Sequence, residues 1–249
     1  MKHLLVLAIL AAPAAWSQTL KARELFYTPP PDAAKPAETK AATKKVAVKP
    51  VATKSGDTHT LSASVPLGLR YAVLKRDASG QYAEVDPDTN FRSGDRIRLH
   101  VDANTSGYLY VVMQGSSGTW KLLFPSAEVA GGSNLVHKGE SRQIPSGDRG
   151  QFVFDEQAGS EKLFIVLTRQ PEPDLDKLIY SMGGKPGDAK DRSLVAQASV
   201  SDNVVSNLRT QSRDLVFEKV DSSENAAYVV NPSTAPDARL VVDVALKHK

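Results

Sequence analysis

Apolar and polar residues alternate along much of the chain from about Leu69 onward. Between Arg96 and Asp102, apolar residues occupy every second position, which is typical of a strand with one buried face. Residues 107–113 and 163–167 are apolar at nearly every position, so we expect both of these strands to be covered on two faces. The same patterns predict further strands over residues 71–75, 82–85, 120–124, 152–154, 215–220, 228–230 and 240–246.

Turn-forming residues separate these segments. Residues 77–80 and 115–118 are rich in Gly, Ser and Asp and predict hairpin connections between neighbouring strands. Helical spacing of apolar residues predicts two short helices, over residues 173–182 and 201–212. Many short strands joined by such turns predict a mainly β fold, an antiparallel β-sandwich or open barrel with one or two short helices. We assign residues 61–249 to a single globular domain.

The first 17 residues have the pattern of a secretory signal peptide. Lys2 and His3 precede an aliphatic run over residues 4–12, and small residues lead to Ser17. The aliphatic run is shorter than the ~20 residues that a membrane-spanning helix needs. We therefore expect cleavage between Ser17 and Gln18, a periplasmic or secreted protein, and no membrane span.

Residues 18–60 join a short apolar segment to a linker rich in Ala, Pro, Lys and Thr. The linker holds too few large apolar residues to fold, and we expect it to be disordered. The apolar segment before it is a candidate docking peptide for a partner. An alternative is that it packs back on its own domain as a strand. Its residues are Leu20, Arg23, Glu24, Leu25, Phe26 and Tyr27.

Composition and charge narrow the function further. The chain has no cysteine, which excludes disulfide bonds, thiol catalysis and cysteine-bound zinc. Its net charge is only +3, and the excess of basic residues lies in the linker. Lys40, Lys44 and Lys45 could attract anionic envelope polymers weakly. We expect no nucleic-acid partner, because no basic and aromatic surface pattern accompanies this charge.

Known catalytic patterns are missing from the sequence. His100 is expected to point outward from its strand into solvent, and no histidine has a second metal ligand at the required spacing. Three acidic pairs are candidates for glycan hydrolysis, but each has a structural explanation in a turn, at a strand end or at a helix start. These pairs are Asp86/Asp88, Asp155/Glu156 and Asp174/Asp176. We predict no catalytic residue, no metal and no cofactor.

The middle of the chain resembles a known bacterial family. The resemblance rests on the order of short motifs: FRSGDRIRL from Phe91, GYLYV from Gly107, LFP from Leu123, Ile144-Pro145, and GSEKL from Gly159. Over residues 91–171 this order resembles the family catalogued as Domain of Unknown Function 4384. The resemblance implies an accessory or recognition module in an exported or envelope-associated protein. It implies no catalytic residues.

These observations favour a non-catalytic module of the bacterial cell envelope that binds an envelope or secreted protein partner. Two alternatives stay open. One is a glycan-binding or glycan-hydrolysing protein of the cell wall, in which strand aromatics or acidic residues contact sugar. The other is a structural subunit of an envelope assembly, which exposed edge strands would favour.

Overall fold

The computed structural model describes residues 21–29, 65–114, 118, 120–125, 133–147, 150–176, 199–211, 214–220 and 224–249. The expected signal peptide, Leu20 and the linker lysines lie outside these residues. The expected helix over 173–182 is described only at residues 173–176, which are helical.

Two seven-stranded sheets form the molecule. Sheet A has the order β12-β13-β1-β4-β8, with β2 also paired to β1 and β9 to β4. Its strands are β1 (Leu67–Arg76), β2 (Tyr82–Val85), β4 (Arg96–Ala103), β8 (Ser141–Ile144), β9 (Phe152–Val153), β12 (Val216–Val220) and β13 (Ala226–Asn231). All pairings within sheet A are antiparallel.

Sheet B has the order β11-β6-β5-β10-β14-β3, with β7 also paired to β5. Its strands are β3 (Asn90–Phe91), β5 (Gly107–Gln114), β6 (Trp120–Phe124), β7 (Leu135–Val136), β10 (Gly159–Thr168), β11 (Ser199–Val200) and β14 (Arg239–His248). The pairing of β3 with β14 is parallel, whereas the other pairings are antiparallel.

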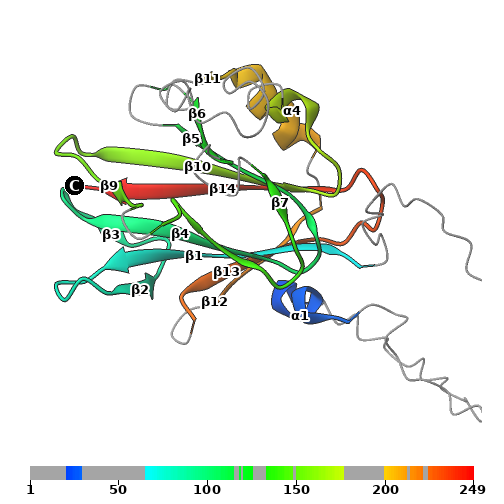
Figure 1. Cartoon of the computed structure of the whole chain (residues 1–249), viewed down its shortest axis with the longest axis horizontal. Coiled ribbons are helices and arrows are strands. Elements are labelled where there is room, and N and C mark those ends of the chain that lie inside the picture. The colour runs from blue at the N-terminus through cyan, green and yellow to red at the C-terminus, as the bar shows by residue number, and fades with distance from the viewer. Residues whose placement is uncertain are drawn as a thin grey trace, which may run out of the picture.

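The two sheets pack face to face around one large core (Figure 1). Period-two alternation turns one side chain in two inward, so Leu69 of β1 and Leu99 of β4 face the partner sheet. Leu240, Val242, Val244 and Leu246 of β14 share the opposite inner face, as their spacing predicts. The fold is therefore the sandwich, one of the two predicted alternatives, and the described strands do not join the two sheets into a closed barrel.

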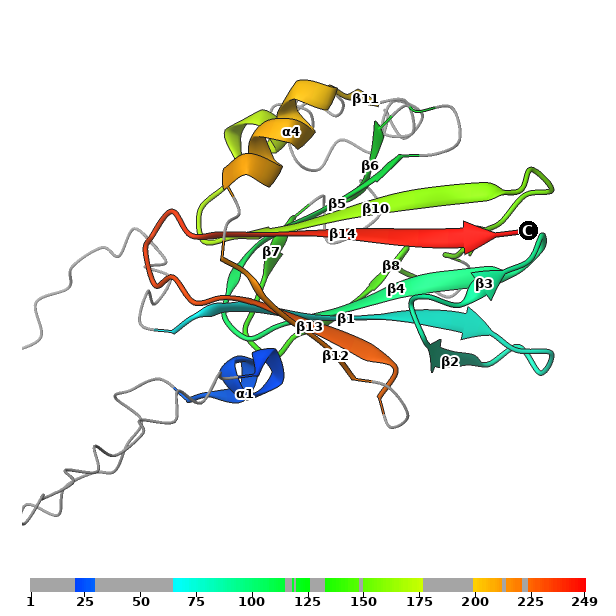
Figure 2. The ribbon, with the colours of Figure 1, turned by 180° about the vertical axis from the view of Figure 1, so that it is seen from behind.

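Among the described residues, helices lie on the outer faces of both sheets. Helix α4 (Asp202–Gln211) lies over sheet B, and helix α1 (Ala22–Tyr27) lies over sheet A (Figure 2). Val205 and Leu208 of α4 are buried against sheet B, which confirms the apolar face predicted for this helix. Helix α1 buries Ala22 and Phe26 against β13, together with Tyr228 and Val230.

The structure confirms the predicted strands and adds several short ones. β1 begins at Leu67, earlier than predicted. The residues on both sides of Arg70 are apolar, so no period-two alternation marks the start of this strand. β3, β7, β8 and β11 were not predicted, since they have at most four residues and no clear apolar alternation. The apolar segment before the linker forms a helix, whereas the sequence suggested a strand if it packed on its own domain.

Candidate functional site

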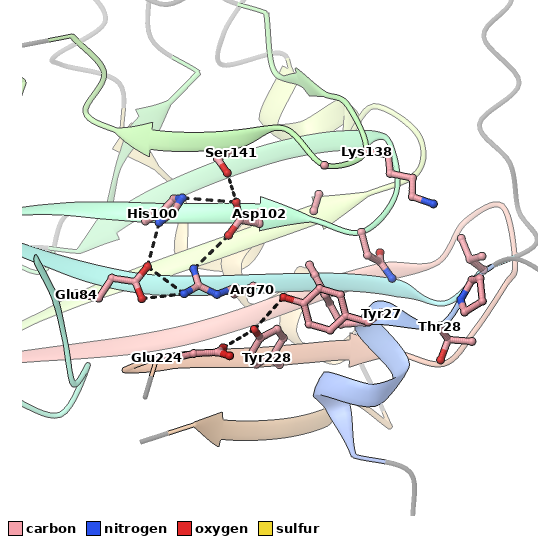
Figure 3. A pocket seen from close by; sticks show the side chains of 16 residues that line it. Tyr27, Thr28, Arg70, Glu84, His100, Asp102, Lys138, Ser141, Glu224 and Tyr228 are labelled. Carbon is pink, nitrogen blue, oxygen red and sulfur yellow. Dashed lines mark hydrogen bonds and ion pairs between the residues drawn. The ribbon is translucent and has the colours of Figure 1, made fainter. Parts of the chain in front are cut away.

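A groove of about 840 Å³ crosses the outer face of sheet A (Figure 3). One wall is the end of α1, with Phe26, Tyr27 and Thr28. The opposite wall is the turn between β7 and β8, with Lys138 and Gly139. The floor is formed by outward-facing side chains of β1, β2, β4 and β13. These are Arg70, Glu84, His100, Asp102 and Tyr228.

Acidic side chains hold α1 on the sheet. The carboxylate of Glu218 on β12 accepts a hydrogen bond from the backbone N–H of Arg23 at 2.9 Å, in the first turn of the helix. The guanidinium of Arg23 forms an ion pair with Glu224. An acid near the first turn also suits the positive end of the helix dipole. The helix is thus positioned by two polar contacts in addition to its buried apolar face.

Gly68 explains how closely α1 approaches the sheet. A Cβ atom at this position would lie 3.0 Å from the ring of Phe26 and 2.8 Å from the side-chain nitrogen of Asn104. Asn104 is itself fixed, because it accepts from the backbone of Gly68 at 2.7 Å and donates to the carbonyl of Pro66. The absence of a side chain at Gly68 therefore makes the room that Phe26 fills.

Four charged or ionisable side chains on the floor form a closed ring, which we call the charge ring. It consists of Glu84, Arg70, Asp102 and His100, contributed by three strands. Arg70 donates two hydrogen bonds to Glu84, at 2.8 and 3.0 Å, and one to Asp102 at 3.2 Å. His100 lies opposite Arg70, with one ring nitrogen near each acid.

The strand register creates the charge ring. Arg70 is the cross-strand partner of Asp102 on the outer face of sheet A, and His100 lies two residues before Asp102 on the same face of β4. Glu84 reaches the ring from β2, which pairs with the far half of β1. Ser141 of β8 adds a hydrogen bond from its hydroxyl to Asp102.

Mutual pairing shifts the ionisation of the ring. Burial raises the pKa of Asp102, but hydrogen bonds from His100 and Ser141 outweigh it and hold that pKa below its usual range. The hydrogen bond to Asp102 is the main cause that raises the pKa of His100, and it outweighs burial. Burial works against the charge of Arg70, yet Glu84 and Asp102 raise its pKa overall. The ring therefore favours its charged form.

A second polar group lies at the wall formed by α1. The hydroxyl of Tyr228 donates to Glu224 at 2.6 Å, and the hydroxyl of Tyr27 lies 3.2 Å from that of Tyr228. Burial and the neighbouring carboxylate of Glu224 raise the pKa of Tyr228. Tyr27 remains 62% exposed, so its ring presents an aromatic surface to the groove.

Most of the candidate docking peptide lies beside the groove. Arg23, Glu24, Leu25, Phe26 and Tyr27 all belong to α1, on their own domain. This is the packing alternative that the sequence left open, in helical form. Docking of the same residues to a partner stays a prediction.

The acidic pairs lie away from the groove. Asp86 and Asp88 both pair with Lys219, at 2.7 and 2.6 Å, next to the turn that follows β2. Asp155 accepts a hydrogen bond from the backbone of Gln157 in a loop. Asp176 accepts from the hydroxyl of Tyr110 at 2.6 Å, over the outer face of sheet B. Asp86, Asp88, Asp155 and Asp176 thus each have a structural partner.

Sequence reasoning missed the groove because it assigned no partners to His100, Arg70 and Glu84. His100 faces outward as predicted, but it is not simply solvated: its side chain is only 21% exposed and contacts two carboxylates. The one available signal was Arg70, a lone charge within the apolar run of β1. A charge there has to find partners on neighbouring strands.

The fold is a β-sandwich with a groove on the outer face of sheet A. Residues 90–171 match the model of a family described as a domain of unknown function, DUF4384. The match confirms the resemblance seen over residues 91–171. No curated protein and no solved structure matches the chain.

The family match covers β3 to β10 and leaves out strands that complete both sheets. β1 pairs with β4 in sheet A, and β14 pairs with β10 in sheet B. The groove is divided in the same way: His100, Asp102 and Lys138 lie within the match, whereas Arg70, Glu84 and all of α1 lie outside it.

Within the described ranges, no three His, Asp or Glu side chains are grouped as metal ligands. None of the helices in those ranges is long and apolar enough to cross a membrane.

Proposed function

We propose that this chain is an exported, non-catalytic recognition module of a bacterial cell envelope, and that its groove binds a protein partner. The observation that carries the proposal is the charge ring, in which each charged side chain of the floor is already paired. The signal-peptide pattern and the family resemblance support an envelope setting.

The pairing pattern suits binding better than bond cleavage. A serine nucleophile needs its hydroxyl beside a histidine base, whereas Ser141 donates to Asp102. Glycoside hydrolysis needs one carboxylic acid with a raised pKa opposite a second carboxylate. Asp102 has a lowered pKa, and both Asp102 and Glu84 are bound to Arg70.

The walls of the groove offer contact area to a protein segment. Tyr27 and Tyr228 supply aromatic surface with little side-chain entropy to lose, which is typical of residues that anchor interfaces. Lys138 stands at the opposite wall and, among the described residues, has no ion-pair partner. It is therefore available to a carboxylate of the partner.

The position of α1 bears on the role of the linker. Pro29, which lies just after α1, and Val65, which lies just before β1, both line the groove. With α1 in place, residues 30–64 connect two points of the same groove. The linker then sets the reach of the domain only when α1 leaves sheet A.

The test is photocrosslinking in cells with benzoylphenylalanine placed at Lys138. The matched control places it at Lys121, another exposed lysine, on sheet B. We expect a protein adduct at Lys138 that is absent at Lys121 and weakened by Tyr27→Ala. Equal adducts at both positions would overturn the proposal. Self-adducts alone would favour a structural subunit, and saccharide adducts alone would favour the glycan alternative.

A further inference from the structure

His100 faces a carboxylate at each of its two ring nitrogens. Nδ1 lies 3.2 Å from Oε1 of Glu84, and Nε2 lies 3.5 Å from Oδ1 of Asp102. A neutral imidazole carries one N–H, so it donates to one acid and turns a lone pair toward the other. The imidazolium carries two N–H groups and satisfies both acids. The geometry therefore fits the charged form of the ring.

The groups around His100 set the charge balance of the floor. β1 contributes Arg70, β2 contributes Glu84, and β4 contributes Arg98 and Asp102 on either side of the histidine. β8 contributes two uncharged groups, Ser141 against Asp102 and Gln143 as the cross-strand partner of His100. Arg98 is turned away, since it donates to Gly150 and Gln143 and stacks over Tyr82.

Within the charge ring, protonation of His100 decides whether the charges cancel. Two carboxylates face one guanidinium and one imidazole. With the imidazolium present, the ring has two negative and two positive members. With the neutral imidazole, one negative charge is left over beside the groove. These charges are half-buried, so the change is less screened than on an open surface.

We propose that His100 is a pH-operated clasp of the groove: its imidazolium ties Glu84 of β2 to Asp102 of β4, and its neutral form releases that tie and leaves the floor negatively charged. As a device that regulates the groove, the clasp rests on the proposed function. Its chemistry is measurable on the protein alone.

The clasp should act in the range where an exported protein meets changing pH. Asp102 and then Glu84 raise the pKa of His100 above the ordinary imidazole value of about 6.5, although burial and Arg70 oppose this. A group with a raised folded pKa stabilises the fold fully below its unfolded pKa. That stabilisation is lost as the pH rises through the folded value.

The first test is NMR titration of the histidine rings in the full chain, repeated in denaturant as the unfolded reference. We expect His100 to titrate at higher pH in the folded protein than in denaturant. Asp102→Asn should lower the folded midpoint more than Glu84→Gln does, because Asp102 is the larger cause. A folded midpoint at or below that of the unfolded chain would overturn the clasp.

The second test is the melting temperature measured between pH 5.5 and 8.5. The wild type and the control His137→Gln, which alters an exposed turn residue, should both lose stability as the pH rises through the His100 titration. His100→Gln should remove that part of the loss. Identical profiles for His100→Gln and wild type would show that the ring does not depend on His100.

The two proposals fail in different ways. If Lys138 captures a protein partner but His100 shows no raised midpoint, the clasp is wrong and the recognition function stands. If His100 titrates as expected while crosslinks at Lys138 and Lys121 are equal, the clasp stands as a property of the fold and the groove is not the partner site.

Discussion

The outer faces of the two sheets differ in what covers them. Sheet B turns a continuous apolar surface outward, and α4 and Leu175 bury it. Its members include Tyr110, Val112, Trp120, Leu122, Phe164 and Val166. Sheet A turns the charge ring outward, and α1 covers only one end of that face (Figure 2).

The two outer faces therefore contribute differently to stability. Burying apolar side chains removes them from water and stabilises the fold by roughly 1.5–3 kcal/mol for each large residue. Half-buried ion pairs contribute much less in net terms, because desolvation offsets most of their attraction. Sheet B therefore carries a second core, whereas the outer face of sheet A keeps an open groove lined by paired charges.

The largest expected effect is at the second core. Phe164→Ala removes a fully buried ring that packs edge-on against Trp120, and we expect a loss of about 3–5 kcal/mol. Denaturant unfolding followed by Trp fluorescence measures this. The control is Phe217→Ala, at a position 57% exposed, which should change stability by no more than about 0.5 kcal/mol. Similar losses for both variants would contradict the second core.

Removing Arg70 tests whether the face of sheet A depends on paired charge. Its side chain is 12% exposed, and Arg70→Ala leaves Glu84 and Asp102 with His100 as their one remaining partner within the charge ring that can carry a positive charge. We expect a loss of about 2–3 kcal/mol in the free energy of unfolding at neutral pH.

The comparison for Arg70 is an exposed ion pair over sheet B. Asp243 pairs with Arg209 at the surface, where both side chains are more than a third exposed. Asp243→Asn should cost less than about 1 kcal/mol. If Asp243→Asn costs as much as Arg70→Ala, burial of the charge ring is not what makes Arg70 important.

A smaller effect is expected where α1 meets sheet A. Gly68→Ala places a methyl group against Asn104 and Phe26, and we expect a loss of about 1–2 kcal/mol with faster amide hydrogen exchange at Arg23. Phe26→Ala alone should also expose Arg23. If Gly68→Ala costs the same in the Phe26→Ala background, Asn104 rather than α1 resists the methyl group.

The smallest expected effect is a pH dependence at the turn before β4. Burial raises the pKa of Asp95, but hydrogen bonds from Lys75 and from the backbone of Arg92 outweigh burial and hold that pKa below its usual range. Its stabilisation is therefore present above the unfolded pKa of about 3.9 and is lost as the pH falls further. Asp95→Asn should flatten the acid limb of the stability profile, and an unchanged limb would contradict this.

The sequence predicts the sandwich well because the strands have a clear period. The alternation from Arg96 to Asp102 marks a strand with one covered face, and the apolar run over residues 107–113 marks one with two. These two patterns already contain the contrast between the outer faces of sheets A and B. The predicted boundary was less accurate at β1, because the apolar residues around Arg70 give no alternation that marks where the strand begins.

The charge ring was beyond sequence reasoning because its members come from three strands. Arg70 and Glu84 are brought together by the register of a hairpin, and Asp102 joins them through a second pairing. Period-two patterns give the face of a side chain but not the residue opposite it. The helix of α1 was also missed, since six residues do not show a helical period and form a stable helix only by packing.

The attachment of α1 has a consequence for proteolysis. Its six residues would hardly form a helix in water alone, and the linker keeps them beside sheet A as an intramolecular ligand at an effective concentration in the millimolar range. One cut anywhere in residues 30–64 would make that contact bimolecular. At ordinary protein concentrations the cut segment would then diffuse away, and the groove would lose an entire wall without any change in the sandwich.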